Sequence, residues 1–303
     1  MSHDTDMIVD RRRLKRRIAV WRGLAIVALV AGVIGGVARF EDWAVRDHVA
    51  RVAVDGIIVD DSALIDALAA VAGDDKAKAL IVKINSPGGT FVGGESLYLA
   101  LRDVAEHKPV LAVMGTVATS AGYMVAIASD RIYARNGTIT GSIGVLMQTT
   151  DITGLLEKIG VSAEAIKSGP LKAAPSPLEP LTDEVRAATQ SVIDDMHALL
   201  TSMVAERRGL DEAGVQRLAD GRVYSGRQAL GHDLIDEIGG ETEARSWLAS
   251  EKGVPAELPT RDIELEKLGG HWFDVLGSIV KNIKVSERLM LDGLMSVWHP
   301  GGG

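Results

Sequence analysis

The sequence contains no cysteine among its 303 residues. This absence excludes disulfide bonds, thiol nucleophiles and zinc sites with cysteine ligands. It leaves the compartment open, because a larger domain can be stable in an oxidising space without disulfide bonds. An excess of basic charge is also missing, since 33 lysines and arginines stand against 41 acidic residues, for a net charge of −8. This balance argues against a nucleic-acid-binding protein, which normally presents a basic surface.

The basic residues that are present gather at the N-terminus. Residues 1–22 carry a net charge of +4, and six basic residues lie between Arg11 and Arg17. An uncharged run follows at residues 23–38, and with residues 18–22 it reaches 21 residues interrupted by Arg22 alone. A membrane-spanning helix needs about 20 apolar residues. We therefore expect a retained transmembrane anchor over residues 18–38.

Two other interpretations of this segment stay open. A cleaved signal peptide would share the basic start, but the apolar run is longer than usual and lacks an Ala-x-Ala cleavage pattern. A buried core helix is the other alternative. Under the anchor interpretation, the basic cluster holds the N-terminus in the cytoplasm. The chain from Arg39 onward then lies on the far side of the membrane.

Strands and helices are predicted to alternate after the anchor. Apolar and β-branched runs predict strands, helical spacing of apolar residues predicts helices, and Asp61 or Ser62 would cap the first helix. The expected strands are 52–59, 79–84, 109–115, 131–134, 141–147 and 163–166, and expected helices include 95–107, 120–129 and 182–208. This alternation indicates βαβ units and a mostly parallel sheet. The active site should then lie in loops at the carboxyl ends of the strands.

Two of these loops carry residues suited to acyl transfer. Residues 85–89 (Asn-Ser-Pro-Gly-Gly) are expected to break the second strand, and the paired glycines of the loop 86–90 would let backbone N–H groups approach an oxyanion. A plain tight turn is the alternative interpretation. In residues 118–123, Ser120 stands at the start of an apolar helix, where the helix dipole favours developing negative charge. Ser120 could instead serve only as a helix cap.

A third loop, residues 168–175, contains Lys172. A serine nucleophile needs a base, and no histidine lies between His107 and His197. A lysine is a base only when neutral, and burial among apolar groups without a nearby acid favours the neutral form. No acidic residue occurs between Ala165 and Leu178. A solvated surface lysine is the alternative.

With residues 140–145 (Thr-Gly-Ser-Ile-Gly-Val), the three loops resemble in order and spacing those of the SppA-type signal peptide peptidases. Residues 220–229 (Asp-Gly-Arg-Val-Tyr-Ser-Gly-Arg-Gln-Ala) and 234–239 are similar to the C-terminal region of that family. The resemblance covers residues 50–250 approximately. It implies a crotonase-like or ClpP-like α/β fold, a spiral of strand–helix units, in a membrane-bound serine protease with a Ser/Lys dyad. No metal or organic cofactor is implied.

The family motifs assign roles to individual residues. Ser120 matches the nucleophile, Lys172 matches its general base, and Ser142 matches the hydroxyl that orients the lysine. The N–H of Ala121, together with that of Gly88 or Gly89, matches the oxyanion hole. Many relatives have glycine where this chain has Ala121, so its methyl group would narrow the pocket.

The resemblance further implies a substrate, an assembly and a location. The substrates would be apolar peptides, chiefly signal peptides already released from preproteins. The protein would form ring-like homo-oligomers in which neighbouring copies complete the dyad. It would lie in a bacterial inner membrane with its catalytic domain on the periplasmic side. The expected layout is a basic tail (1–17), the anchor (18–38), a linker (39–50), the protease domain (51–250) and an amphipathic extension (251–303).

Three rival functions are compatible with the fold. Acyl-CoA hydratases and isomerases share it, but they need carboxylates at the acyl site, and Glu95 is the one acid near the first loop. A Ser-His-Asp site of the ClpP kind would need a histidine about 25 residues after Ser120, where residues 144–148 read Gly-Val-Leu-Met-Gln. A non-catalytic membrane scaffold of the same fold is the third.

Overall fold

The computed structural model describes residues 21–33, 46–263 and 295–297, in two units, Met1–Asp47 and His48–Gly303. In the first unit, residues 21–33 form a helix whose side chains are all exposed. No helix in the described ranges is long and apolar enough to cross a membrane. The rest of the predicted anchor, residues 18–20 and 34–38, lies outside them, as do the basic tail and most of the C-terminal extension.

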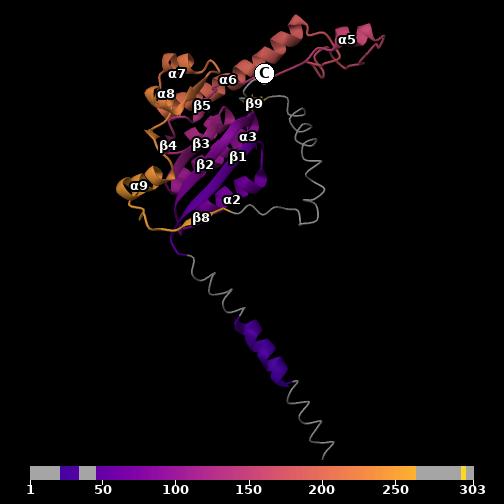
Figure 1. Ribbon diagram of the computed structural model, residues 1–303. Coiled ribbons are helices and arrows are strands. Elements are labelled where there is room, and N and C mark those ends of the chain that lie inside the picture. The colour runs from indigo at the N-terminus through magenta and orange to yellow at the C-terminus, as the bar shows by residue number, and fades with distance from the viewer. Residues whose placement is uncertain (1–20, 34–45, 264–294, 298–303) are drawn as a thin grey trace, which may run out of the picture. The chain divides into compact units, whose positions relative to one another are not determined.

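The second unit is built on one mixed sheet of mostly parallel strands, as the alternating pattern predicts (Figure 1). Its centre is formed by three parallel neighbours, β1 (His48–Ile58), β2 (Ala77–Thr90) and β3 (Val110–Thr119). The shorter strands are β4 (Arg131–Ala134), β5 (Ile139–Gly141), β6 (Val223–Ser225), β7 (Glu237–Ile238), β8 (Thr260–Asp262) and β9 (Met295–Val297). Strands β6 and β9 run antiparallel to β5 and β2, respectively.

Helices cover both faces of the sheet (Figure 1). They are α2 (Ser62–Gly73), α3 (Phe91–His107), α4 (Ala121–Ile127), α5 (Thr153–Lys158), α6 (Asp183–Arg208), α7 (Glu212–Leu218), α8 (Gly226–Gly231) and α9 (Glu241–Lys252). Alternate residues of a strand point to opposite faces. On β2, Leu80 and Val82 therefore join the core under α2, α3 and α4, whereas Ile81 joins a smaller core under α9.

Polar residues mark the helix starts. Asp61 caps α2 by accepting hydrogen bonds from the N–H groups of Ala63 and Leu64, so it is the cap of the two candidates. Thr182 caps α6 by accepting from Val185 N. Thr90 caps α3, which therefore begins at Phe91 and not at residue 95. Each cap satisfies an N–H group that the helix itself leaves unpaired.

The strand predictions fail at three places. Strand β2 does not break at residues 85–89 but continues to Thr90, because a register shift against β1 lets the glycines stay paired. The strand expected at 141–147 ends at Gly141, since Ser142 turns into a positive φ of 51°. Residues 163–166 form no strand and are exposed. The sequence pattern of these residues predicts a strand, but none of the described strands pairs with them.

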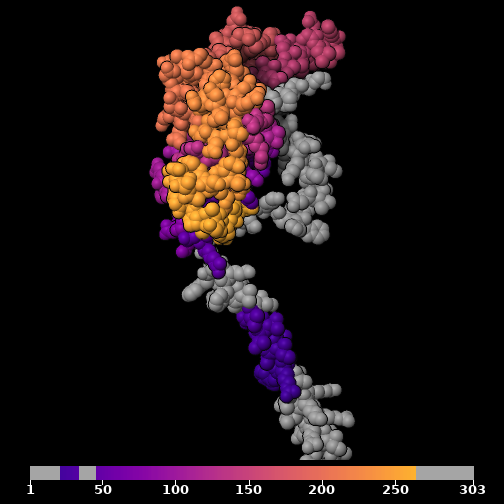
Figure 2. Space-filling model, turned by 60° about the vertical axis from the view of Figure 1, so that its left-hand side comes forward, coloured from indigo at the N-terminus to yellow at the C-terminus, as the bar shows by residue number. Residues whose placement is uncertain are grey.

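Residues 145–182, which we call the arm, form a projection that includes α5 (Figure 2). No residue of α5 is buried. The exposed large apolar side chains of the arm are Leu146, Leu155, Ile159, Val161, Ile166, Leu171 and Leu178. Helix α6 also carries apolar residues at helical spacing that are largely exposed to solvent. Among them, Val192 and Leu199 are 44% and 42% exposed, and we call this face the apolar stripe of α6. Within this chain, α6 is buried only toward its C-terminal end, at Leu200, Thr201, Met203 and Val204.

Two fully buried tyrosines provide a matched stability test. The Tyr123 hydroxyl donates to Leu234 O at 2.9 Å, whereas the Tyr133 hydroxyl meets no partner at good hydrogen-bond geometry in the described ranges and lies near the Arg131 guanidinium. Tyr123→Phe should lower the free energy of unfolding by about 1–2 kcal/mol, because it leaves a buried carbonyl unpaired. Tyr133→Phe should leave it unchanged or raise it. Urea denaturation followed by tryptophan fluorescence measures both, and equal losses would contradict this assignment of partners.

Candidate active site

Ser120 occupies a strained turn between β3 and α4. Its backbone has φ 59° and ψ −119°, a conformation that favours glycine and costs another residue about 1–3 kcal/mol. The residue is 2% exposed, and its side chain makes no capping hydrogen bond to α4. Ser120 thus stands at the N-cap position of α4, but its side chain does not cap the helix. A sharp strand-to-helix turn of this kind is typical of a nucleophile elbow.

Strand β5 holds Ser120 and Ser142 on either side of one peptide unit. The Ser120 N–H donates to Gly141 O at 2.9 Å, and Ser142 follows directly with its N–H donated to Arg222 O at 2.8 Å. Gly141 must be glycine, because a Cβ there would lie 2.6 Å from Cδ2 of Tyr224. The structure thus brings together the two predicted serines.

Residues 220–229 contribute a supporting role that sequence reasoning did not assign. Their strand β6 pairs with β5, and Arg222 supplies the carbonyl that holds Ser142. The contact between Tyr224 and Gly141 fixes how closely the two strands approach. The one sequence signal for this packing is the pair of Tyr224 and Gly141. These residues are far apart in the sequence, so the sequence alone does not show that their strands are neighbours.

Residues 86–90 at the end of β2, which we call the glycine loop, lie against the start of α4. Thr119 Oγ1 donates to Pro87 O at 3.0 Å, and a Cβ on Gly122 would lie 3.0 Å from Ser86 O. A side chain at Gly89 is excluded, because its Cβ would lie 1.8 Å from Ile58 O. The predicted oxyanion-hole segment and the Ser120 turn are therefore neighbours.

Within this loop, Gly88 and Ser86 contact each other. Gly88 has φ 114°, and its N–H donates to the Oγ of the fully buried Ser86 at 3.0 Å. The Ser86 hydroxyl thus fixes the orientation of the Gly88 peptide next to the Ser120 turn. Sequence reasoning treated Ser86 only as part of a turn, because a buried hydroxyl cannot be distinguished from an exposed one by its place beside proline.

Lys172 lies apart from this cluster in the single chain. It is exposed on the arm, and none of the contacts among the described residues joins its side chain to Ser120 or Ser142. The next residue, Ala173, has a positive φ of 59°. The burial that was expected around Lys172 is therefore absent from its own chain.

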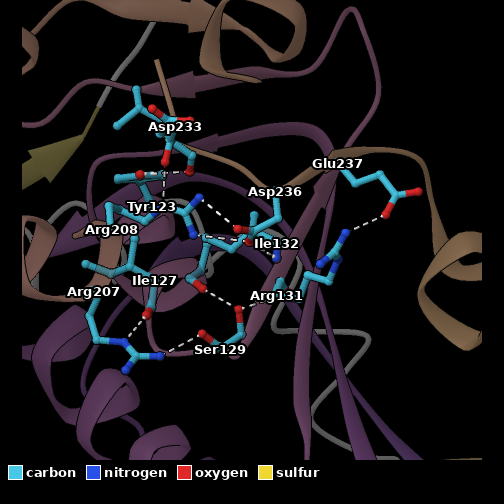
Figure 3. A network of polar contacts seen from close by, with 12 residues as sticks. Tyr123, Ile127, Ser129, Arg131, Ile132, Arg207, Arg208, Asp233, Asp236 and Glu237 are labelled. Atoms are coloured by element: carbon cyan, nitrogen blue, oxygen red, sulfur yellow. Dashed lines mark hydrogen bonds and ion pairs between the residues drawn. The ribbon is translucent and has the colours of Figure 1, made fainter. Parts of the chain in front are cut away.

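A polar network supports the other end of α4 (Figure 3). Arg207, in the last turn of α6, donates to the carbonyl oxygens of Ile127 and Ser129, each at 2.9 Å. Arginines at a helix C-terminus satisfy carbonyls that the helix leaves unpaired and complement its dipole. The same helix follows the arm in sequence, so α6 connects the segment that carries Lys172 with the base of α4.

The neighbouring Arg208 ties α6 to the segment before β7 (Figure 3). Its guanidinium donates to both carboxylate oxygens of Asp236, and Asp236 also accepts from Ile132 N at 2.7 Å. Burial raises the pKa of the nearby Tyr123, so its hydroxyl stays protonated and continues to donate to Leu234 O. Arginine pairs at the end of an amphipathic helix gave no sequence signal for this role.

Comparison with known proteins identifies the family. A profile described as peptidase family S49 matches residues 102–255. A Synechocystis sp. protein that is provisionally named a protease is similar to this chain. The two are 40% identical over 211 residues, which cover 69% of this chain and 76% of that protein. The chain belongs to peptidase family S49. This membership supports a serine protease and confirms the resemblance to SppA-type enzymes.

Other similarities are more limited. An Enterococcus faecium protein with a provisional name as the signal peptide peptidase SppA is 37% identical over 184 residues, covering 59% of this chain. The chain spans about half (53%) of the length of that S49 relative. A ClpP1 variant from Listeria monocytogenes aligns at 16% identity with a TM-score of 0.43, covering 63% of this chain and 91% of that chain. A score this low carries no argument, so the mixed α/β sheet of this S49 chain rests on its own strand pairing.

The strain at Ser120 predicts an unusual order of stabilities for this S49 protein. Ser120→Gly relieves the unfavourable φ, whereas Ser120→Ala keeps a Cβ at the same position. We expect the glycine variant to be more stable than the alanine variant by about 1 kcal/mol, despite the usual entropic cost of glycine. Urea unfolding of both variants tests this. An alanine variant as stable as the glycine variant would show that the turn is unstrained.

Proposed function

We propose that this S49 protein is an endopeptidase in which Ser120 is the nucleophile and Lys172 of a neighbouring copy is the general base. The observation that carries the proposal is the strained, buried Ser120 turn, which lies beside the glycine loop and Ser142. A glycine at position 120 would adopt this backbone conformation without strain. A strained serine there is therefore expected if its side chain is needed for function. Lys172 of the same chain is exposed on the arm.

The chemistry follows the usual course of acyl transfer. The Ser120 hydroxyl attacks the peptide carbonyl while the neutral Lys172 amine accepts its proton. The N–H of Ala121, with that of Gly89, stabilises the resulting oxyanion, because the Gly88 N–H already donates to Ser86 Oγ. Collapse of this intermediate releases the amine product, which takes the proton from Lys172. Water then hydrolyses the acyl-enzyme with Lys172 as base, and the Ser142 hydroxyl keeps the lysine oriented.

The edge of β2 offers a place for the substrate. Residues 295–297 of this chain pair antiparallel with Gly88–Thr90. This pairing supports the idea that an extended peptide can bind along the same residues, next to Ser120. A peptide bound there would gain main-chain hydrogen bonds and present one carbonyl to the nucleophile. We propose apolar peptides, chiefly released signal peptides, as the substrates.

The arm supports an oligomer. Its apolar side chains and the uncovered stripe of α6 would be buried against a second copy, and exposed apolar patches of this kind mark interaction sites. Burial of Lys172 in such an interface would favour its neutral form. We propose a ring of copies in which each arm delivers Lys172 to the Ser120 cluster of its neighbour.

Membrane attachment completes the proposal. The exposed apolar side chains of residues 21–33 and the basic residues before them fit a retained anchor in a bacterial inner membrane. The protease unit would then lie on the periplasmic side, where released signal peptides are accessible from the bilayer. No metal or organic cofactor takes part in this mechanism.

Mixed oligomers test the shared dyad. Ser120→Ala and Lys172→Ala should each abolish peptide hydrolysis, and Lys172→Arg should do the same at every pH because guanidinium does not deprotonate. Co-assembled Ser120→Ala and Lys172→Ala chains should regain part of the activity, because some interfaces pair an intact Ser120 with an intact Lys172. Turnover of a quenched apolar peptide measures this. Absence of rescue despite demonstrated mixing would place the dyad within one chain, and activity in Ser120→Ala would refute the nucleophile.

The orientation can be tested separately. A reporter enzyme that is active only after export should be active when fused after Gly303, because the basic cluster holds the N-terminus in the cytoplasm. Neutralising residues Arg11 to Arg17 should reduce that activity. Activity of a cytoplasm-only reporter at the same position would show the opposite orientation.

A further inference from the structure

Strand β3 contains an irregularity shortly before Ser120. Its register with β2 runs from Ile84↔Met114 directly to Ser86↔Ala118. Three residues of β3, Gly115 to Val117, therefore stand opposite the single residue Asn85. A bulge of this kind leaves main-chain groups without partners in the neighbouring strand and bends the strand.

The side chain of Asn85 takes the place of the missing backbone partners. Its Oδ1 accepts hydrogen bonds from Thr116 N at 3.1 Å and Val117 N at 3.3 Å. Two N–H donors directed at one atom require the amide oxygen there, because the amide nitrogen cannot accept. Gly115 provides the space, since a Cβ on it would lie 3.2 Å from both Cβ and Oδ1 of Asn85.

The opposite side of the bulge is closed by a second side chain. Thr138, just before β5, donates through Oγ1 to Gly115 O at 2.8 Å. Across the bulge, β3 changes its partner on this side, from β4 at residues 111–113 to β5 at residues 117–119. The new partner supplies the Gly141 carbonyl that holds Ser120 N. The bulge thus directs the end of β3 into the Ser120 turn.

We infer that Asn85 is a positioning residue for the nucleophile, an inference that rests on the proposed role of Ser120. Asn85 fixes the bulge through Thr116 and Val117, which lie four and three residues before Ser120. Its neighbour Ser86 fixes the Gly88 peptide. Two adjacent side chains at the end of β2 therefore set the distance between the nucleophile turn and the glycine loop. Displacement of a reacting group by about 1 Å can reduce a rate by a factor of about 100.

The test compares an isosteric apolar variant with one that keeps the acceptor. Asn85→Leu removes both hydrogen bonds at similar volume, and we expect kcat for peptide hydrolysis to fall roughly 10–100-fold with KM changed less than about twofold. Asn85→Asp keeps an oxygen acceptor and should retain kcat within about threefold. The cavity beside Asn85 is lined by charges of both signs, namely Lys83, Arg135, Asp55 and Glu241, so the added carboxylate has two basic partners to offset the two acidic neighbours.

Two further readouts separate positioning from general destabilisation. The active fraction of each preparation is titrated with a fluorophosphonate probe that labels serine, so that kcat is expressed per reactive site. Thermal unfolding confirms that assays run well below the transition. A leucine variant with kcat per labelled site within twofold of the original, or an aspartate variant as impaired as the leucine variant, would overturn the inference. Ser120→Ala serves as the control: its activity alone decides the nucleophile, whatever the Asn85 variants do.

Discussion

The hydrogen bond from Ser120 N to Gly141 O is the contact on which the site depends. It joins the last residue before α4 to the end of β5, and so holds Ser120 in a backbone conformation that glycine would occupy with less strain. Strand β5 is in turn held by β6, whose Arg222 carbonyl accepts the next N–H, that of Ser142. One peptide unit therefore determines where both serine side chains lie.

Helix α6 links this site to the part of the chain that carries Lys172. The helix has 26 residues and is about 39 Å long at 1.5 Å per residue. Its Arg207 holds the C-terminal end of α4, whereas its first turns continue the arm and bury little of their apolar surface in this chain. A single copy thus presents a formed Ser120 turn and an exposed Lys172. In our account a second copy covers the arm and brings the two together.

The sequence predicted the α/β class and the segments that meet at the site, because strand and helix periodicity and the carboxyl ends of parallel strands are local properties. The position of Ser120 next to the glycine loop follows from that rule. Ser142 came from the family resemblance instead, because the strand expected at 141–147 would have placed it at a strand start. What it could not predict depends on contacts between distant residues. Asn85, placed in a turn, in fact continues β2 and closes a bulge in β3. Composition alone also assigned a strand to residues 163–166, where the single chain offers no partner strand.

The central claim is that Ser120 and Lys172 meet between copies, and distance measurement tests it most directly. Because the chain contains no cysteine, Ser120→Cys and Lys172→Cys introduce the only thiols. The two variants are placed on separately tagged chains, co-assembled in the membrane and treated with a short bifunctional thiol reagent. The account predicts cross-linked pairs that carry both tags. A chain with both substitutions that cross-links only within itself, with no mixed-tag product, would contradict it.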